Sequence, residues 1–245
     1  MFVISEKIAQ QTVNILDAIG VVERVFSAME KQEAVNYPVV RESLDSLNAV
    51  FGVKSGFDGA GMALGLKAGG YWKDNLSRGV ENHQSGILLF DHETGRAKAV
   101  VSATYLTGLR TAASSALAAK YIARKDAKTL GIFGAGGQAE FQIMAMAGLL
   151  GIEKVIAFDI STKNLELLAE KMAETSLDFQ VGDAESTASQ ADILVTVTPA
   201  QSPILEKNWI QKGTHICAMG ADTKGKQELP VDLVSESNVF VDSLE

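Results

Sequence analysis

The sequence is poor in the residues that build covalent or metal-held frameworks. It has one cysteine, Cys217, and three histidines among 245 residues. A single thiol excludes an internal disulfide framework and favours a reducing compartment. With so few sulfur and nitrogen ligands, a structural zinc site is not expected, and we predict no metal centre.

Cations and long apolar runs are also scarce. Lysine and arginine number 22 against 30 acidic residues, and the net charge is −8. Nucleic-acid binding needs a positive footprint, so this charge argues against a nucleic-acid partner. No stretch reaches the roughly 18 to 20 consecutive apolar residues that cross a bilayer, and the first residues lack the apolar core of a secretory signal. We therefore expect a cytoplasmic protein without a membrane partner.

The first half of the chain contains two segments with different residue patterns. Residues 5–34 carry apolar side chains at helical spacing, whereas residues 39–101 place short apolar runs between glycine, aspartate and asparagine. The segment FDHETGRAKAVV predicts a strand, a turn at residues 92–95 and a second strand. Together these features predict a small α+β domain with a mostly antiparallel sheet.

The second half alternates strands with helices. An alanine-rich helix is expected over residues 104–124, and helices are expected over residues 138–150 and 162–174. Six candidate strands accompany them, at residues 129–133, 154–158, 177–181, 192–196, 214–218 and 238–242. This alternation predicts a parallel sheet with crossover helices.

Small residues follow the first of these strands. They read Gly134, Ala135, Gly136, Gly137, Gln138 and Ala139, a G-x-G-x-x-A motif between an apolar strand and a helix. In this motif Gly134 permits a tight turn, Gly136 lets the backbone approach a pyrophosphate, and Ala139 lets helix and strand pack closely. The N–H groups and dipole of the helix N-terminus favour phosphate binding. The motif predicts a Rossmann dinucleotide-binding fold.

An acidic residue ends the next strand. Asp159 lies 25 residues after Gly134, where a carboxylate can hydrogen-bond the adenosine ribose. Its charge would repel a 2′-phosphate, so NAD(H) is favoured over NADP(H). The alternative is an ordinary surface aspartate that caps the helix beginning near Ser161.

Several cations lie in surroundings that are unusual for solvated charges. Arg110 is in an alanine- and leucine-rich segment, Lys54 and Lys67 are in glycine-rich apolar segments, and Arg41 follows an extended one. A guanidinium can bind both oxygens of a substrate carboxylate. The alternatives are an internal salt bridge at Arg110, a lysine that extends to solvent and a simple surface charge at Arg41.

Two residues are candidates for proton transfer. Asp222 lies in a glycine-flanked loop after the fifth candidate strand, and such loops face the cofactor crevice in Rossmann folds. A partly desolvated carboxylate there would suit proton transfer, although an Asx turn is an equal alternative. His83 is either a proton donor or a structural histidine at the start of a strand.

The segment LTGLRTAASSALAAKYIARKDAKTLGIFGAGGQA resembles the ornithine cyclodeaminase/mu-crystallin family, in which an arginine-bearing helix leads directly into a Rossmann strand and glycine loop. The segments PVVRES, DHETG, ADILVTVTP and GTHICAMGADTKGKQEL extend the resemblance through nearly the whole chain. The resemblance implies an α/β fold with an α+β substrate-binding and dimerisation domain at residues 1–118 and an NAD-binding Rossmann domain at residues 119–245. It also implies a homodimer and, because family members run longer, a further C-terminal segment.

The resemblance also implies roles for individual residues. Substrate binding is implied for five polar residues: Arg41, Lys67, Arg110, His83 and Gln84. Asp222 is implied as the acid/base residue, with Lys67 as the second catalytic candidate. Cofactor binding is implied for Thr111, in addition to Asp159 and residues 134–139.

Within the family, the segments around Arg41, Lys67 and Asp222 are most similar to members that reduce iminosuccinate to L-aspartate with NADH. The cyclodeaminases differ at Gln84 and in the strand around Lys67. The resemblance therefore implies an NADH-dependent reductase of an amino-acid-derived imine. The alternatives are an ornithine cyclodeaminase, which releases ammonia and recycles its NAD, and a non-enzymatic, crystallin-like nucleotide-binding protein.

Overall fold

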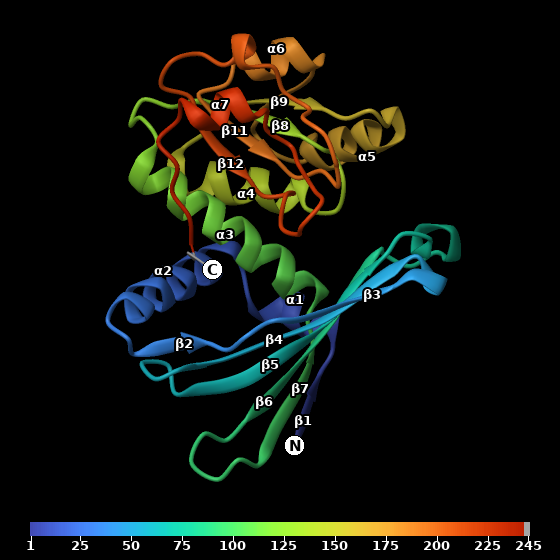
Figure 1. Ribbon diagram of the computed structural model, residues 1–245, viewed down its shortest axis with the longest axis vertical. Helices are drawn as coiled ribbons and strands as arrows, with labels where there is room; N and C mark the ends of the chain where they lie inside the picture. The colour runs from blue at the N-terminus through green and yellow to red at the C-terminus, as the bar shows by residue number, and fades with distance from the viewer. Residues whose placement is uncertain (243–245) are drawn as a thin grey trace. The chain divides into compact units, whose positions relative to one another are not determined.

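A computed structural model describes residues 1–242 (Figure 1). The chain forms two compact units, Met1–Ser114 and Ser115–Glu245. The division falls inside helix α3 (Thr104–Ile122), which gives its first turns to one unit and the remainder to the other. The boundary expected from the sequence, after residue 118, falls in the same helix.

The first unit contains a seven-stranded sheet. Its strands run in the order β1-β7-β6-β5-β4-β2, and β3 also pairs with β4. Only β1 and β7 are parallel; the other pairs are antiparallel. The strands are β1 (Phe2–Ile4), β2 (Ala34–Asn36), β3 (Val40–Leu44), β4 (Ala49–Asp58), β5 (Ala63–Trp72), β6 (His83–Phe90) and β7 (Ala97–Ser102). The expected hairpin is confirmed as β6 and β7.

Two helices, α1 (Glu6–Thr12) and α2 (Ile15–Glu30), occupy the segment for which helical spacing was predicted. The structure differs from one continuous helix because Val13 is extended and Asn14 starts a new N-terminus. The Asn14 side chain accepts from the Asp17 backbone N–H at 3.0 Å, and Asp17 accepts from the Asn14 N–H at 3.1 Å. This reciprocal capping box ends one helix and begins the next.

Helix α3 is tied to the sheet of the first unit at its N-terminus. The carboxylate of Glu6 accepts from the hydroxyl of Ser102 at 2.5 Å and from the backbone N–H of Tyr105. Because the first N–H groups of a helix have no partner within the helix, an acceptor here fixes where α3 begins. The residues of α3 that follow are thereby placed relative to β5 and β6.

The second unit has a five-stranded, wholly parallel sheet in the order β10-β9-β8-β11-β12. The strands are β8 (Thr129–Phe133), β9 (Lys154–Phe158), β10 (Asp178–Val181), β11 (Ile193–Thr196) and β12 (His215–Ala218), and the helices are α4 (Ala139–Leu150), α5 (Thr162–Met172), α6 (Ala184–Ser189) and α7 (Val231–Ser235). The order reverses between β8 and β11, as in the doubly wound dinucleotide-binding fold. The Rossmann prediction is confirmed.

The core of this unit is made by residues that the sequence places on strands and on one helix face. Phe133 and Leu194 are almost fully buried, and they pack with Ala188, Ala191 and Leu205. Strands that are buried on both faces are uniformly apolar, which explains why TLGIF and ILVT read as continuous runs. Among the described residues, no helix is long and apolar enough to cross a bilayer.

The sixth expected strand is not formed. Residues 238–242 have the composition of a strand, yet they make no ladder within the described part of the chain, where β12 pairs with β11 alone. The side chains of Val239, Phe240 and Val241 are 61%, 66% and 59% exposed. Strand propensity reflects how well a residue fits a sheet that offers it both a pairing edge and a face to pack against. Residues 238–242 use neither, so their composition alone does not make them a strand.

Candidate functional site

The glycine loop lies at the carboxyl end of β8, next to the point where the strand order reverses. The N–H of Gly134 donates to the carbonyl of Phe158 at 2.8 Å, and Gly134 has a φ of +100°. A Cβ at this position would lie 3.0 Å from the Val197 carbonyl oxygen. Only glycine suits both the left-handed backbone and the close approach of the chain after β11.

The next two glycines differ from Gly134 because they face open space. A Cβ built on Gly136 or on Gly137 meets no atom within 4 Å. Neither has a positive φ, so the local fold does not require glycine there. Ala139 is fully buried, which allows α4 to pack directly on β8. The open surface over Gly136 and Gly137, in front of the α4 N-terminus, fits the pyrophosphate of a dinucleotide.

Asp159 organises the same loop. Its Oδ2 accepts from the N–H of Ala135 at 2.6 Å, and its Oδ1 accepts from the N–H of Ser161 at 2.7 Å. Ser161, and not Asp159, is the N-cap of α5, because its hydroxyl accepts from Asn164. Each carboxylate oxygen has a second lone pair, so Asp159 can hold the loop and also accept from ribose hydroxyls.

One buried polar atom of the loop has no partner in the protein. The amide oxygen of Gln138 is buried and accepts no hydrogen bond. Buried acceptors are nearly always satisfied, so an orphan beside the glycines fits a group that a ligand supplies. The residues present therefore fit a bound dinucleotide.

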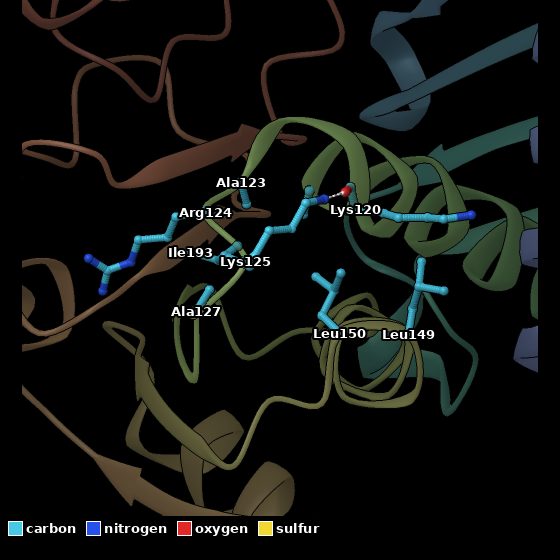
Figure 2. Close-up of a pocket in the computed structure, with 9 residues that line it drawn as sticks. Lys120, Ala123, Arg124, Lys125, Ala127, Leu149, Leu150 and Ile193 are labelled. Carbon is cyan, nitrogen blue, oxygen red and sulfur yellow. Dashed lines mark hydrogen bonds between the residues drawn. The ribbon is translucent and has the colours of Figure 1, made fainter.

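A separate hollow of about 250 Å³ lies at the opposite edge of the sheet (Figure 2). Its lining includes Ala127, just before β8, and Ile193, the first residue of β11. Lys125 donates to the carbonyl of Lys120 at 2.6 Å and so caps the end of α3. Ligands of doubly wound sheets bind at the carboxyl ends of the strands, so this hollow is not the dinucleotide site.

In the first unit, Lys67 on β5 reaches helix α3. Its Nζ donates to the hydroxyl of Thr107 at 3.3 Å, and that hydroxyl also lies 3.1 Å from the Ser85 hydroxyl. Thr107 is buried, with 5% exposure. A lysine held at its tip by a buried hydroxyl does not extend freely to solvent. Lys54, which lies opposite Lys67 in the ladder, is the more exposed of the two.

Arg110 follows Thr107 by three residues on α3. It is exposed, whereas Thr107, Gly108 and Leu109 before it are buried. Residues three apart lie on neighbouring parts of one helix face, so α3 carries Arg110 on the side that meets Lys67 through Thr107. Thr111 donates to the Thr107 carbonyl at 2.7 Å, and its oxygen retains acceptor capacity.

The sheet register brings further predicted residues to the face that bears Lys67. Arg41 pairs with Gly52, and Gly52 pairs with Gly69, which lies two residues after Lys67 on β5. Direct partners and alternate residues of a strand share one face, so Arg41 and Lys67 share a face with only glycine between them.

The same register separates His83 from Gln84. His83 pairs with Tyr71, which shares the face of Lys67, whereas Gln84 pairs with Gly70 on the other face. The Gln84 side chain donates to the Glu81 carbonyl at 3.0 Å. Among the predicted substrate ligands, Gln84 is therefore the one that the pleat turns away from the lysine face.

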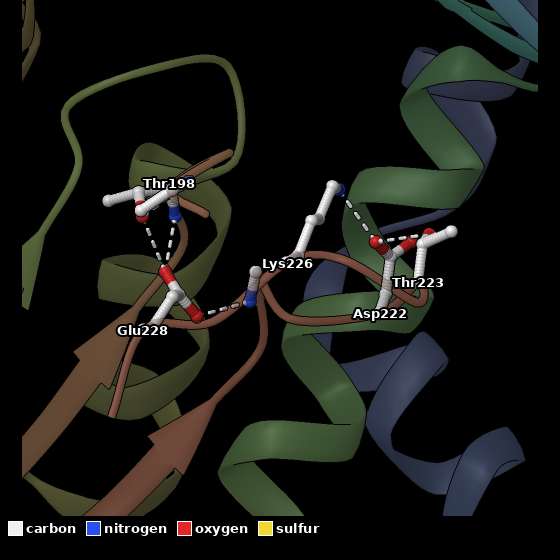
Figure 3. Close-up of polar contacts among 7 residues, drawn as sticks. Thr198, Asp222, Thr223, Lys226 and Glu228 are labelled. Atoms are coloured by element: carbon white, nitrogen blue, oxygen red, sulfur yellow. Dashed lines mark hydrogen bonds and ion pairs between the residues drawn. The ribbon is translucent and has the colours of Figure 1, made fainter. Parts of the chain in front are cut away.

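Asp222 lies in the loop after β12 (Figure 3). Its Oδ1 accepts from Lys226 at 2.7 Å and from the Thr223 hydroxyl at 3.0 Å. The side chain is 52% exposed. The partly desolvated carboxylate expected from the sequence is thus a half-exposed group in an ion pair within its own loop.

A second carboxylate nearby in the sequence was not singled out by the motifs. Glu228 is fully buried, and its two oxygens accept four hydrogen bonds (Figure 3). The donors are the Thr196 hydroxyl, the Thr198 hydroxyl and the N–H groups of Thr198 and Gly220. The only sequence signal for it is an acidic residue in the otherwise uncharged segment QELP.

The whole chain, residues 1–245, matches the family model described as the ornithine cyclodeaminase/mu-crystallin family. The chain is 43% identical over 244 residues to the iminosuccinate reductase of Paracoccus denitrificans, a match that covers 100% of this chain and 76% of the relative. The crystal structure of that reductase in complex with NAD+ superposes with a TM-score of 0.91 over 99% of this chain and 76% of the other.

Two further solved structures share the fold at 30% identity. One is the Δ1-pyrroline-2-carboxylate reductase of Thermococcus litoralis in complex with NADH and L-proline, with a TM-score of 0.93 over 97% of this chain and 74% of that one. The other is an archaeal alanine dehydrogenase dimer with bound NAD, with a TM-score of 0.91 over 97% and 72%. The match over the full length and the shared architecture agree, and the chain belongs to the ornithine cyclodeaminase/mu-crystallin family.

Proposed function

We propose that the protein is an NADH-dependent reductase of an amino-acid-derived imine, with iminosuccinate as substrate and L-aspartate as product. The observation that carries the proposal is the loop at residues 134–139, whose open glycines in front of the α4 N-terminus fit a pyrophosphate. A relative that is 43% identical over 244 residues is an iminosuccinate reductase, and its crystal structure contains NAD+.

The preference for NADH over NADPH follows from Asp159. Its carboxylate is fixed by the N–H groups of Ala135 and Ser161, so it cannot easily turn away from a ligand at the end of β9. A fixed negative charge accepts from ribose hydroxyls and repels a 2′-phosphate. Thr111 is the further residue to which we assign a cofactor contact.

The substrate is an anion, and the cations of the first unit would bind it. Arg110 and Lys67 hold the α-carboxylate, because a guanidinium and an ammonium together fix its position and its plane. The second carboxylate of iminosuccinate needs another cation, which Arg41 on the same sheet face, or His83, supplies. Gln84 is also proposed as a substrate ligand, although the sheet register turns its side chain to the face opposite Lys67.

The reaction joins one hydride and one proton to the C=N bond and forms a C–H and an N–H bond. Bound NADH supplies the hydride and leaves as NAD+. Asp222 is assigned to proton transfer at the nitrogen, taking the proton from solvent and passing it on, and its carboxylate also accepts from Lys226 at 2.7 Å. Lys67 has a second role as a cation close to the reacting group. Fixing a planar imine in one orientation gives much of the rate advantage.

The proposal includes a homodimer. The sheet of the first unit leaves apolar side chains exposed on one face, including Val3 at 75% and Val100 at 39%, which are direct partners on β1 and β7. Apolar side chains that share one sheet face are typical of an interface. The proposed setting is the cytoplasm.

The test is NADH oxidation in the presence of oxaloacetate and ammonia, which form iminosuccinate in solution. We expect oxidation that requires both compounds and yields aspartate. Oxaloacetate alone controls for ketone reduction, and other 2-oxo acids with ammonia rank the side chains by kcat/KM. Ammonia release from ornithine without net NADH oxidation would instead identify a cyclodeaminase. Tight NADH binding without turnover of any substrate would favour a binding protein.

A further inference from the structure

We propose that Glu228 is a positioning residue that locks the loop carrying Asp222 onto the loop after β11. The inference rests on the proposed function, in which Asp222 transfers a proton. Glu228 lies in the second unit, as do all four of its donors, and none of these donors belongs to a residue to which we assign substrate or cofactor.

The carboxylate takes three hydrogen bonds from the end of β11 and the loop that follows it, and one from the loop after β12. Its Oε1 accepts from the N–H and the hydroxyl of Thr198, at 2.7 and 2.8 Å. Its Oε2 accepts from the N–H of Gly220 and the hydroxyl of Thr196, both at 2.8 Å. Thr198 follows β11 and Gly220 follows β12, so one buried side chain bridges the carboxyl ends of two adjacent strands (Figure 3).

These contacts hold both ends of the Asp222 loop. Gly220 is held by Glu228, and at the other end the N–H of Gln227 donates to the carbonyl of Ala200 at 2.9 Å. Asp222 lies two residues beyond Gly220, and within the loop it accepts from Lys226 and from Thr223. Gly220 and Gln227 therefore anchor the segment that carries Asp222 to the residues at and after the end of β11.

Gly220 packs closely against both Thr198 and Glu228. A Cβ at Gly220 would lie 2.2 Å from the Thr198 carbonyl oxygen and 2.5 Å from Oε1 of Glu228. Both loops are thus in direct contact around the carboxylate. A small movement of one must be matched by the other.

Glutamine is the decisive substitution because it keeps the shape and removes one acceptor. Each carboxylate oxygen accepts one backbone N–H, and a backbone N–H cannot reverse its role as a hydroxyl can. An amide at position 228 can keep its oxygen on Thr198, which offers two donors. Its NH2 then faces the N–H of Gly220, a group that has a second acceptor in the Thr196 carbonyl at 3.1 Å. Glu228→Gln should therefore release the Gly220 side, which carries Asp222.

The matched control is Thr196→Val. Thr196 is fully buried at the end of β11, and valine removes one hydrogen bond to the same carboxylate while both loop N–H contacts remain. We expect Thr196→Val to keep kcat within about twofold of the wild type, whereas Glu228→Gln lowers kcat at least tenfold with a smaller change in the KM of the imine.

Two readouts separate positioning from a general structural role. In hydrogen exchange of the ligand-free protein, Glu228→Gln should raise exchange in residues 218–226 and leave the glycine loop at residues 134–139 unchanged. In the Asp222→Asn background, Glu228→Gln should lower kcat little further, because the two changes act through one group. Should Glu228→Gln fail to fold, Gly220→Ala provides the second variant, since its methyl group forces the loops apart and should lower kcat in the same way.

Three results would overturn the inference. They are unchanged exchange in residues 218–226, a kcat within twofold of Thr196→Val, or a full additional loss of kcat in the Asp222→Asn background. If the wild type binds NADH but reduces no imine, the proposed function is wrong. Hydrogen exchange in residues 218–226 of Glu228→Gln would then still show whether Glu228 holds the loop.

Discussion

The two glycines at positions 134 and 136 should respond in opposite ways to the same substitution. Gly134 has a φ of +100° and lies 3.0 Å from backbone and side-chain atoms once a Cβ is added. Gly136 has open space at that position and no positive φ. Alanine at 134 therefore strains the protein itself, whereas alanine at 136 disturbs only what binds there.

The magnitudes follow from these two environments. A residue with a side chain forced into a sparsely populated backbone region costs about 1–3 kcal/mol, so Gly134→Ala should lower Tm by roughly 2–4 °C for each kcal/mol in a chain of this size. Gly136→Ala should leave Tm unchanged or slightly higher, since alanine also restricts the unfolded chain. A methyl group in a space that a phosphate fills costs about 1–3 kcal/mol, which is roughly 5- to 150-fold in Kd.

Thermal unfolding of the ligand-free variants and calorimetric titration with NADH measure the two effects separately. Gly20→Ala serves as the control, because Gly20 also faces open space without a positive φ but lies in α2, outside the loop. Wild-type affinity for NADH in Gly136→Ala would refute the assignment of this loop to the pyrophosphate. A destabilised Gly136→Ala would show that its open space is filled by the protein.

Three further predictions address the cofactor, the substrate and the buried thiol. Asp159→Asn should raise the Kd for NADH and lower the ratio of the Kd for NADPH to the Kd for NADH, both measured by titration. An unchanged ratio would show that Asp159 does not determine the choice between the two cofactors. Arg110→Ala should raise the KM of the imine by about tenfold or more, as expected for a lost hydrogen-bonded charge pair, while Arg96→Ala, an exposed residue of the β6–β7 turn, should leave KM unchanged. Burial raises the pKa of the Cys217 thiol to about 12 from a usual value of 9.0. Because the raised value belongs to the folded state, its contribution to stability is complete below pH 9 and is lost as the pH rises towards 12. The free energy of unfolding should therefore fall less between pH 8 and 10.5 in Cys217→Ala than in the wild type, and an equal fall would contradict this.

Features set by local sequence were predicted well. The glycine loop, the five inner strands and the helix over 104–122 depend on neighbouring residues: a run of apolar side chains, a small-residue turn and good helix formers. The break between α1 and α2 was also readable, because Asn14 and Asp17 have the spacing of a capping box. This break was not predicted from the sequence, because the apolar residues keep helical spacing on both sides of Val13.

Features set by pairing between distant segments were predicted poorly. Residues 238–242 have strand composition, but whether a strand forms depends on an edge that the composition does not describe. The placement of Gln84 on the face opposite Lys67 depends on register, and a shift of one residue would reverse it. His83 and Gln84 are neighbours in the sequence, so only the pairing with Tyr71 and Gly70 separates them.

Glu228 shows why a buried carboxylate with four hydrogen bonds can lack a sequence motif of its own. Three of its four hydrogen bonds come from Thr196 and Thr198, residues 32 and 30 positions earlier in the chain. Two of the four donors are backbone N–H groups, which every residue except proline has. A side chain that recognises backbone leaves no complementary residue type for a pattern to detect. Asp222, by contrast, stands out in the sequence because it lies between glycines, and within its loop it accepts from Thr223 and Lys226. If Glu228 positions Asp222 as we propose, the carboxylate that the sequence makes conspicuous depends on one that it does not.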